Sequence, residues 1–226
     1  MKLYNMVLFA SFLGLFGPNK SIAQDWANLK KYQAANEKLK IAEANENRVV
    51  FMGNSITEGW PVAFFENNAY INRGISGQTT PQMLLRFRQD VIDLHPKIVI
   101  ILAGTNDIAG NTGPMTLEEI CGNILSMVEL AEANNITPII CSVLPAFDYP
   151  WRPGLEPNVK IPKLNSMLQR MAQQKGVHYL DYFTAMADER NGLSKELASD
   201  EVHPTSKGYA MMEPLVLKAI QEVLKN

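Results

Sequence analysis

The amino-acid sequence predicts an α/β fold, a three-layer α/β/α sandwich around a parallel sheet. Short apolar runs that suit strands alternate with longer segments whose apolar residues recur at helical spacing. The run at 97–104, KIVIILAG, is almost continuously apolar, which is typical of a parallel strand buried on both faces. The chain has 226 residues, 46% of them hydrophobic, which suits one α/β domain with a full core.

The first residues have the composition of a secretory signal peptide. Lys2 precedes an apolar run at 6–17, and the small residues Ser21 and Ala23 occupy the positions that a signal peptidase reads. We expect cleavage before Gln24. A retained anchor helix fits less well, because the run is short for a lipid bilayer.

This segment sets the expected domain organisation and location. Residues 1–23 should be removed, and residues 24–226 should form a single domain that is exported to the periplasm or secreted. No cysteine directly follows the apolar run, so the sequence does not suggest a lipid anchor. We expect no stable membrane anchor after cleavage.

The elements follow in order along the chain. Residues 25–46 are rich in helix formers and should form an N-terminal helix packed on the domain, with apolar positions at Trp26, Leu29, Tyr32 and Leu39. Strands are expected at 48–53, 70–75, 97–104, 137–144 and 177–181. Helices are expected at 80–94, 116–135, 159–176 and 205–226.

Individual residues support the helix ends. Pro81 suits a first helical turn, and Thr116 with Glu119 fits a capping box. Gly176 closes the third of these helices. Pro214 lies inside the last one and should kink or restart it.

Polar tetrapeptides follow the strands, at the edge where parallel sheets bind ligands. They are GNSI (53–56), GISG (74–77) and GTND (104–107), with a fourth, DEVH (200–203), in the loop before the last helix. Singly, each has an ordinary reading, since Ser55 suits a turn or cap and Gly77 a tight turn. Their joint position at one sheet edge favours a functional site.

These residues supply the parts of an acyl-transfer site. Ser55 can be the nucleophile, His203 the base, and Asp200 the group that orients the imidazole. His95 and His178 should lie at the opposite end of the sheet, which leaves His203 as the best base.

A second set of groups can bind the developing oxyanion. The oxyanion hole would consist of the backbone N–H groups of Ser55 and Gly77 and the side-chain amide of Asn106. Gly77 has no Cβ, so the backbone can approach a substrate closely there.

In these blocks the sequence resembles the SGNH hydrolases, also called GDSL esterases and lipases. The blocks GNSI, NRGISGQT, GTND and DEVHPTSKGY occur in family order between residues 49 and 210. The resemblance places the family's marker residues at Ser55, Gly77, Asn106 and His203, with Asp200 as the acid. It implies a flavodoxin-like sheet, a Ser-His-Asp triad, a three-donor oxyanion hole, and neither metal nor cofactor.

One position departs from the family pattern. The first block usually reads Gly-Asp-Ser, whereas this chain has Asn54 before Ser55. That aspartate is not the triad acid, so the acyl chemistry should be retained. Asparagine keeps the turn preference and removes one negative charge beside the nucleophile.

A proline- and aromatic-rich loop at 145–158 should lie on the same face as the site. Residues expected to line the substrate are Trp60, Arg73, Tyr149 and Trp151, together with Phe147 and Arg152. Aromatic faces suit sugar rings and the arginines suit an anionic substrate, although the loop could equally pack on itself. No long apolar lid is evident, which argues against long-chain lipid.

Composition narrows the classes of partner. A net charge of -2 gives no basic surface for nucleic acid.

Cys121 and Cys141 fall in a predicted helix and the strand after it, which are too far apart for a disulfide, so two buried thiols are expected. Their spacing gives no metal signature. Oligomeric state is left open.

The resemblance to the SGNH hydrolases and the expected export together favour a serine esterase for short acyl groups, in particular a carbohydrate deacetylase. A lysophospholipase or thioesterase with the same triad is an alternative. A non-catalytic glycan-binding module is the other, but it would not need Ser55, Asp200 and His203 together.

Overall fold

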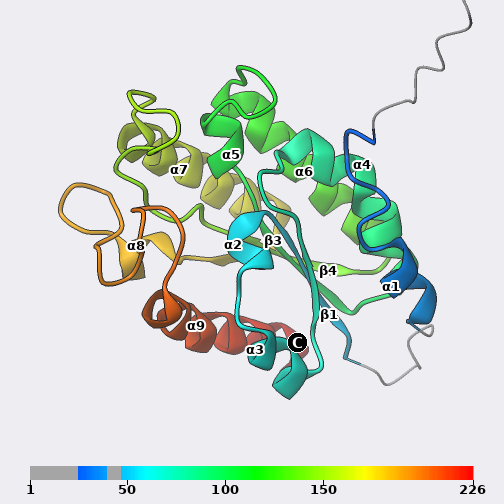
Figure 1. The fold of residues 1–226 in the computed structure, drawn as a ribbon. Coiled ribbons are helices and arrows are strands. Elements are labelled where there is room, and N and C mark those ends of the chain that lie inside the picture. Colours follow the sequence, from blue (N-terminus) through cyan, green and yellow to red (C-terminus); the bar gives the residue numbers. More distant parts are fainter. Residues whose placement is uncertain (1–24, 40–46, 226) are drawn as a thin grey trace, which may run out of the picture.

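The computed structural model describes residues 25–39 and 47–225, so the expected signal peptide lies outside the described residues. One sheet of five parallel strands has the order β2-β1-β3-β4-β5 (Figure 1). The strands are β1 Val49–Gly53, β2 Ile71–Gly74, β3 Ile98–Leu102, β4 Thr137–Cys141 and β5 His178–Leu180. This order confirms the predicted α/β fold with a flavodoxin-like sheet. It places the topological switch point between β1 and β3, where such sheets bind ligands.

The helices separate into long ones that cover the sheet and short ones at its edges. They are α1 Gln33–Lys38, α2 Ser55–Glu58, α3 Val62–Asn68, α4 Thr80–Asp90, α5 Thr105–Ile108, α6 Leu117–Ala133, α7 Pro157–Lys175, α8 Phe183–Met186 and α9 Ser206–Lys225, with a 3₁₀ turn at Ile92–Leu94. None of the helices that the structure describes is long and apolar enough to cross a membrane.

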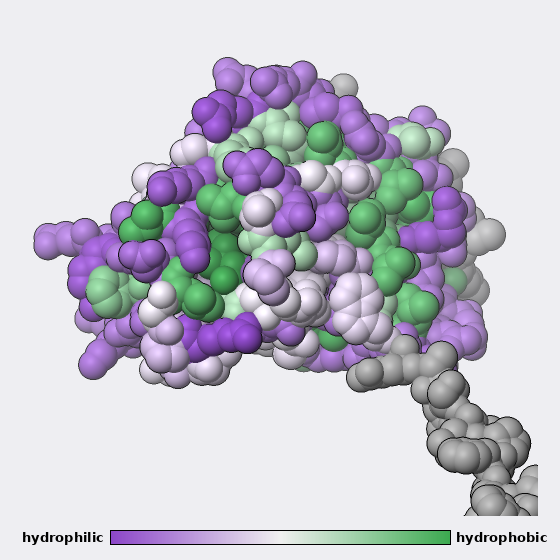
Figure 2. Space-filling model, turned by 90° about the horizontal axis from the view of Figure 1, so that it is seen from above, coloured by the Kyte–Doolittle hydropathy of each residue, from purple (hydrophilic) through white to green (hydrophobic). Residues whose placement is uncertain are grey.

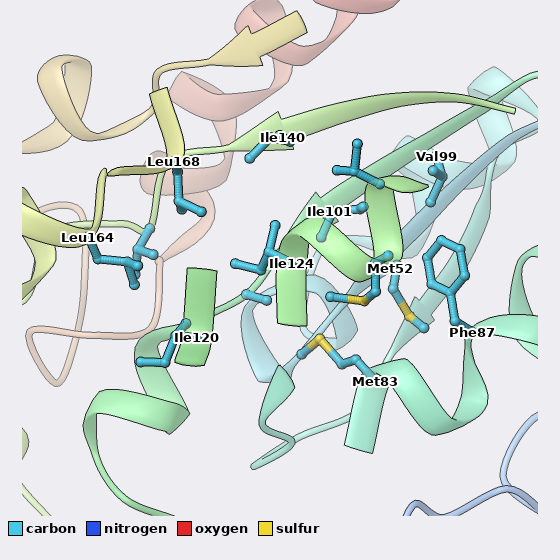
Figure 3. Close-up of a cluster of buried hydrophobic side chains, with 14 of the residues drawn as sticks. Met52, Met83, Phe87, Val99, Ile101, Ile120, Ile124, Ile140, Leu164 and Leu168 are labelled. Atoms are coloured by element: carbon cyan, nitrogen blue, oxygen red, sulfur yellow. The ribbon is translucent and has the colours of Figure 1, made fainter. Parts of the chain in front are cut away.

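Two hydrophobic layers hold the helices on the sheet. Alternate residues of β1 point to opposite faces, so Met52 belongs to the buried layer that contains residues of α4, α6 and α7, while Phe51 belongs to the layer that contains residues of α3 and α9. Figure 3 shows the first layer, with Met83 and Ile124 meeting the sheet side chains. Every residue of β1 and β3 is buried, which explains the continuous apolar runs in the sequence.

The N-terminal helix predicted over 25–46 is confirmed only at α1, and the rest of the described part of that range is not helical. Turns occupy 26–32 and only α1 is helical, while residues 40–46 lie outside the described residues. The Asp25 carboxylate accepts the backbone N–H groups of Leu29 and Lys30, and Asn28 is left-handed at φ 54°. These local bonds compete with helical hydrogen bonds in the first turns.

Helix α9 continues through Pro214 rather than restarting there. The missing N–H of Pro214 deprives the Ala210 carbonyl of its helical partner. Both residues are exposed, so water can reach that carbonyl.

The two cysteines differ in their surroundings. Both are free; Cys141 is buried as expected, whereas Cys121 is only half-buried on α6. Burial raises the pKa of both thiols, which disfavours the reactive thiolate.

Two glycines allow α2 to lie directly on the ends of β1 and β2. A Cβ on Gly74 would lie 2.1 Å from the Glu58 nitrogen, and one on Gly53 would lie 2.0 Å from Thr57 Oγ1. No rotamer change can relieve the first contact, because the obstacle is backbone. Gly74 is therefore required for the position of α2.

Gly74→Ala should destabilise the protein by about 1–3 kcal/mol, because the added methyl overlaps the α2 backbone. Gly122→Ala is the matched control: it lies inside α6 with no atom within 4 Å of its added Cβ, so it should be stabilising by about 0.5–1 kcal/mol. Urea unfolding of both variants measures the difference. Equal stability of the two would contradict the packing argument.

Candidate active site

Ser55 begins α2, immediately beyond the end of β1. Asn54 is the N-cap residue, and its Oδ1 accepts the Ile56 N–H at 3.1 Å. Either asparagine or aspartate can supply that oxygen. The substitution at position 54 therefore keeps the turn that presents the Ser55 hydroxyl.

A continuous chain of hydrogen bonds joins Ser55, His203 and Asp200. Ser55 Oγ lies 2.9 Å from His203 Nε2, and His203 Nδ1 lies 2.6 Å from Asp200 Oδ2. The second Asp200 oxygen accepts the backbone N–H groups of His203 at 2.7 Å and Val202 at 3.1 Å. One carboxylate thus holds both the backbone and the imidazole of His203.

The environment of Asp200 keeps it ionised. Burial by itself would raise its pKa, but the hydrogen bonds from His203 and Val202 outweigh burial and lower the pKa below its ordinary value. A carboxylate can only accept, so Nδ1 of His203 carries the proton. Nε2 is then an acceptor that faces the Ser55 hydroxyl, the arrangement required of a general base.

Three hydrogen-bond donors were predicted to form an oxyanion hole. Asn106 is buried in α5, and its Nδ2 donates to the Gln78 carbonyl at 3.0 Å, which uses one of its two N–H bonds. Gly77 has φ 76°, and its carbonyl accepts from Asn111 Nδ2 at 3.1 Å. Within the described residues, no protein acceptor binds the N–H of Ser55 or Gly77, so both can donate to a ligand.

Asp107, next to Asn106, has a structural role that the sequence did not reveal. Its Oδ1 accepts the Thr80 N–H at 2.8 Å and hydroxyl at 2.5 Å, which ties α5 to the first turn of α4. Its Oδ2 has no partner among the described residues. Burial raises the pKa of this carboxyl despite the Thr80 bonds.

Two of the residues predicted to line the substrate do not do so. Trp60 is only 3% exposed; it stacks on Phe64 at 5.1 Å, and its indole N–H donates to Glu213. Arg73 is 5% exposed, donates to Asn36, and lies over the ring of Tyr32. Both predictions were wrong, because the short helix α3, which the sequence analysis did not predict, covers Trp60, and the N-terminal segment covers Arg73.

Two residues of the aromatic loop after β4, Tyr149 and Trp151, were predicted to line the substrate, and they have different surroundings. Tyr149 is buried and its hydroxyl lies 3.0 Å from Thr105 Oγ1, so it contacts the start of α5, the helix that carries Asn106. Trp151 stacks on Tyr149 at 5.2 Å and remains 45% exposed. Its ring lies 6.0 Å from that of His203, which makes it an open surface beside the base.

The remaining two loop side chains, Arg152 and Phe147, are exposed but make contacts with other parts of the protein. Arg152 Nη1 donates to the carbonyls of Ala109 and Gly110, at the end of α5. Phe147 is partly covered by the guanidinium of Arg190. In the described part of the chain, no group of three or more His, Cys, Asp or Glu side chains is placed to hold a metal ion.

Comparison with known proteins matches this description. The model of the GDSL-like lipase/acylhydrolase family matches residues 51–211. The structure of a protein assigned as an acylhydrolase from Bacteroides fragilis is 48% identical, covers 89% of this chain and 99% of its own, and has a TM-score of 0.87. That of a GDSL-like lipase from Bacteroides thetaiotaomicron is 47% identical, covers 87% and 98%, and has a TM-score of 0.84.

Two further similarities are weaker, one in sequence identity and the other in the share of the chain that it covers. An acetyl xylan esterase is 17% identical, covers 76% of this chain and 98% of its own, and has a TM-score of 0.64, which shows a shared fold alone. An uncharacterised lipoprotein of Bacillus subtilis is 35% identical over 81 residues, 34% of this chain. That match spans 33% of the lipoprotein's length.

Asp107→Asn should remove a pH-dependent loss of stability. The raised pKa means that the folded protein retains the Asp107 proton to a higher pH than the unfolded chain does. The wild type should therefore lose stability relative to the variant as the pH rises from about 4, the unfolded pKa, through the folded pKa. Urea unfolding at a series of pH values measures this difference.

Asp200→Asn is the matched control with the opposite sign. Its folded pKa is lowered, so the stability that its carboxylate contributes is present above about pH 4 and lost as the pH falls through the folded pKa. A stability difference for Asp107→Asn that does not change with pH would show that this carboxyl has no raised pKa.

Proposed function

Since the chain belongs to the GDSL-like lipase/acylhydrolase family and is a carboxylic ester hydrolase, we propose that it uses Ser55, His203 and Asp200 as a catalytic triad. The family is the one predicted from the four sequence blocks. The proposed substrates are short-chain acyl esters, in particular acetyl esters of carbohydrates. The hydrogen-bonded chain from Ser55 Oγ through His203 to Asp200 is the observation that carries this proposal.

The reaction follows from the two contacts of His203. Its Nε2 takes the Ser55 proton as Oγ attacks the ester carbonyl carbon, and Asp200 stabilises the imidazolium. The imidazolium then protonates the leaving alcohol, and an acyl-serine forms. Water, deprotonated by the same nitrogen, attacks the acyl-serine, and Ser55 recovers its proton as the acid leaves.

The oxyanion of both tetrahedral intermediates would accept from Ser55 N–H, Gly77 N–H and Asn106 Nδ2. Two observations support this role. The two backbone donors have no acceptor within the described residues, and the bond from Asn106 to the Gln78 carbonyl fixes its amide plane. Donors fixed before reaction stabilise developing charge without a cost of reorganisation.

The surface beside His203 supports a small acyl group on a sugar. Trp151 presents an open aromatic face there, of the kind that packs on sugar rings. Figure 2 shows a face on which hydrophilic side chains divide the hydrophobic surface into separate patches. The fold is also that of an acetyl xylan esterase, although the likeness shows the fold alone.

Export is part of the proposal. The apolar run at 6–17 and the small residues before Gln24 support removal of residues 1–23 as a signal peptide. The Bacillus subtilis relative is a lipoprotein, which agrees with a location outside the cytoplasm. A soluble enzyme released after cleavage would meet polymeric or oligomeric carbohydrate esters there.

Ser55→Ala should abolish turnover, because no other group within the triad can form the acyl-enzyme. Ser166→Ala, which changes an exposed serine on α7, is the matched control and should keep wild-type activity. Release of acid from acetylated xylo-oligosaccharides and from acetyl, butyryl and octanoyl aryl esters measures both. Near wild-type activity of Ser55→Ala would exclude the triad, and rates that rise with chain length would favour a lysophospholipase or thioesterase.

Asn106→Ala should lower kcat by about 100-fold or more, roughly 3 kcal/mol, and leave KM within a few-fold. Its amide donates to an oxygen that carries full negative charge only in the transition state. Asn106→Asp should be at least as damaging, because a carboxylate repels the oxyanion. Unchanged kcat with a lowered melting temperature would make Asn106 a residue of the turn alone.

A further inference from the structure

A completely buried arginine lies directly behind the proposed site. Arg86, on α4, has 0% of its surface exposed. Its Nε donates to Gln78 Oε1 at 2.5 Å, its Nη2 to the Gly53 carbonyl at 2.9 Å, and its Nη1 to Asp90 Oδ2 at 3.0 Å. The rigid, planar guanidinium fixes the relative positions of these three acceptors.

One acceptor leads to the nucleophile. Gly53 ends β1 and is followed by Asn54 and Ser55, so its carbonyl orients the turn that carries the nucleophile. The same carbonyl accepts the Ile75 N–H at 3.1 Å. The β1 end is thereby joined both to Arg86 and to the loop that contains Gly77.

The second acceptor leads to the oxyanion hole. Gln78 follows Gly77, and its backbone carbonyl accepts from Asn106 Nδ2. Its side-chain Nε2 donates to the Ala27 carbonyl at 2.7 Å, so the amide is held between Arg86 and the N-terminal segment. Any displacement of Gln78 would therefore move Gly77 and Asn106 together.

The third acceptor compensates the buried charge. Burial lowers the pKa of Arg86, and Asp90 opposes that change. The other Asp90 oxygen accepts from Asn36 Nδ2 at 2.7 Å. An apolar side chain at position 86 would leave a buried carboxylate and two buried oxygens with fewer partners, which is costly.

We infer that Arg86 is a positioning residue, which sets the distance between the Ser55 turn and the oxyanion donors Gly77 and Asn106 by binding Gly53 and Gln78 at once. This inference rests on the proposed function. It assigns the guanidinium no contact with substrate. Its effect is on the geometry of the hole, where a displacement of about 1 Å can lower the rate on the order of 100-fold.

Arg86→Lys tests the inference with the charge retained and the fork removed. We expect kcat to fall on the order of 10- to 100-fold, with KM within about 3-fold, because the hole acts on the transition state. Gln78→Met removes the link to the loop without unbalancing Asp90 and should give the same pattern. It keeps the inference testable if Arg86→Lys does not fold.

Arg73→Lys is the matched control, since Arg73 is also a buried arginine but bonds Asn36 and the Asn72 carbonyl rather than Gly53 or Gln78. It should lower the melting temperature and leave kcat unchanged. All assays are run well below the lowest melting temperature of the set.

A double-mutant cycle with Asn106→Ala separates positioning from a general loss of stability. If Arg86 acts through the hole, its substitution should cost much less once the Asn106 amide is gone. Additive losses, or unchanged kcat in folded Arg86→Lys and Gln78→Met, would overturn the inference. Activity retained in Ser55→Ala would instead overturn the proposed function.

Discussion

The carbonyl group of Gly53 is the point at which the core and the candidate site meet. It ends a strand whose residues are all buried, and it accepts hydrogen bonds from Ile75 and Arg86. A parallel sheet presents its strand ends at one edge, but it does not by itself set the distances between the loops that follow. Here the distance between the Ser55 turn and the loop that contains Gly77 is set by the Gly53 carbonyl, which binds both Ile75 and Arg86. Gly53 and Gly74 also let α2 lie against both strand ends.

Two carboxylates near the site, Asp200 and Asp107, have different surroundings, which suit one to a catalytic role and the other to a structural role. Asp200 accepts several hydrogen bonds at a half-exposed position, and its pKa is lowered. Asp107 is buried with an unpartnered oxygen, and its pKa is raised. The first is suited to stabilise a charged imidazolium during turnover. The second holds Thr80 and the start of α4, so it serves the framework around Asn106.

The aromatic residues show why composition is a weak guide to a binding surface. Trp60, Tyr149 and Trp151 look equivalent in a sequence near a predicted site. The first belongs to the layer of α3 and α9, the second lies under the loop, and only the third is open beside His203. Burial of an aromatic ring is strongly favourable, so a loop tends to bury most of the rings it carries.

The sequence alone determined the fold class, because the alternation of strand and helix patterns admits few topologies. It also identified Ser55, His203, Asp200 and Asn106 as candidates, because four short blocks carry residue types that one reaction needs. Only the tertiary structure decided that Arg86, Gln78 and Asp107 support them, and that Trp60 and Arg73 do not line a substrate. Periodicity reports which face of an element is apolar. Which polar groups meet behind a site depends on contacts between segments far apart in the chain, and no local pattern encodes these.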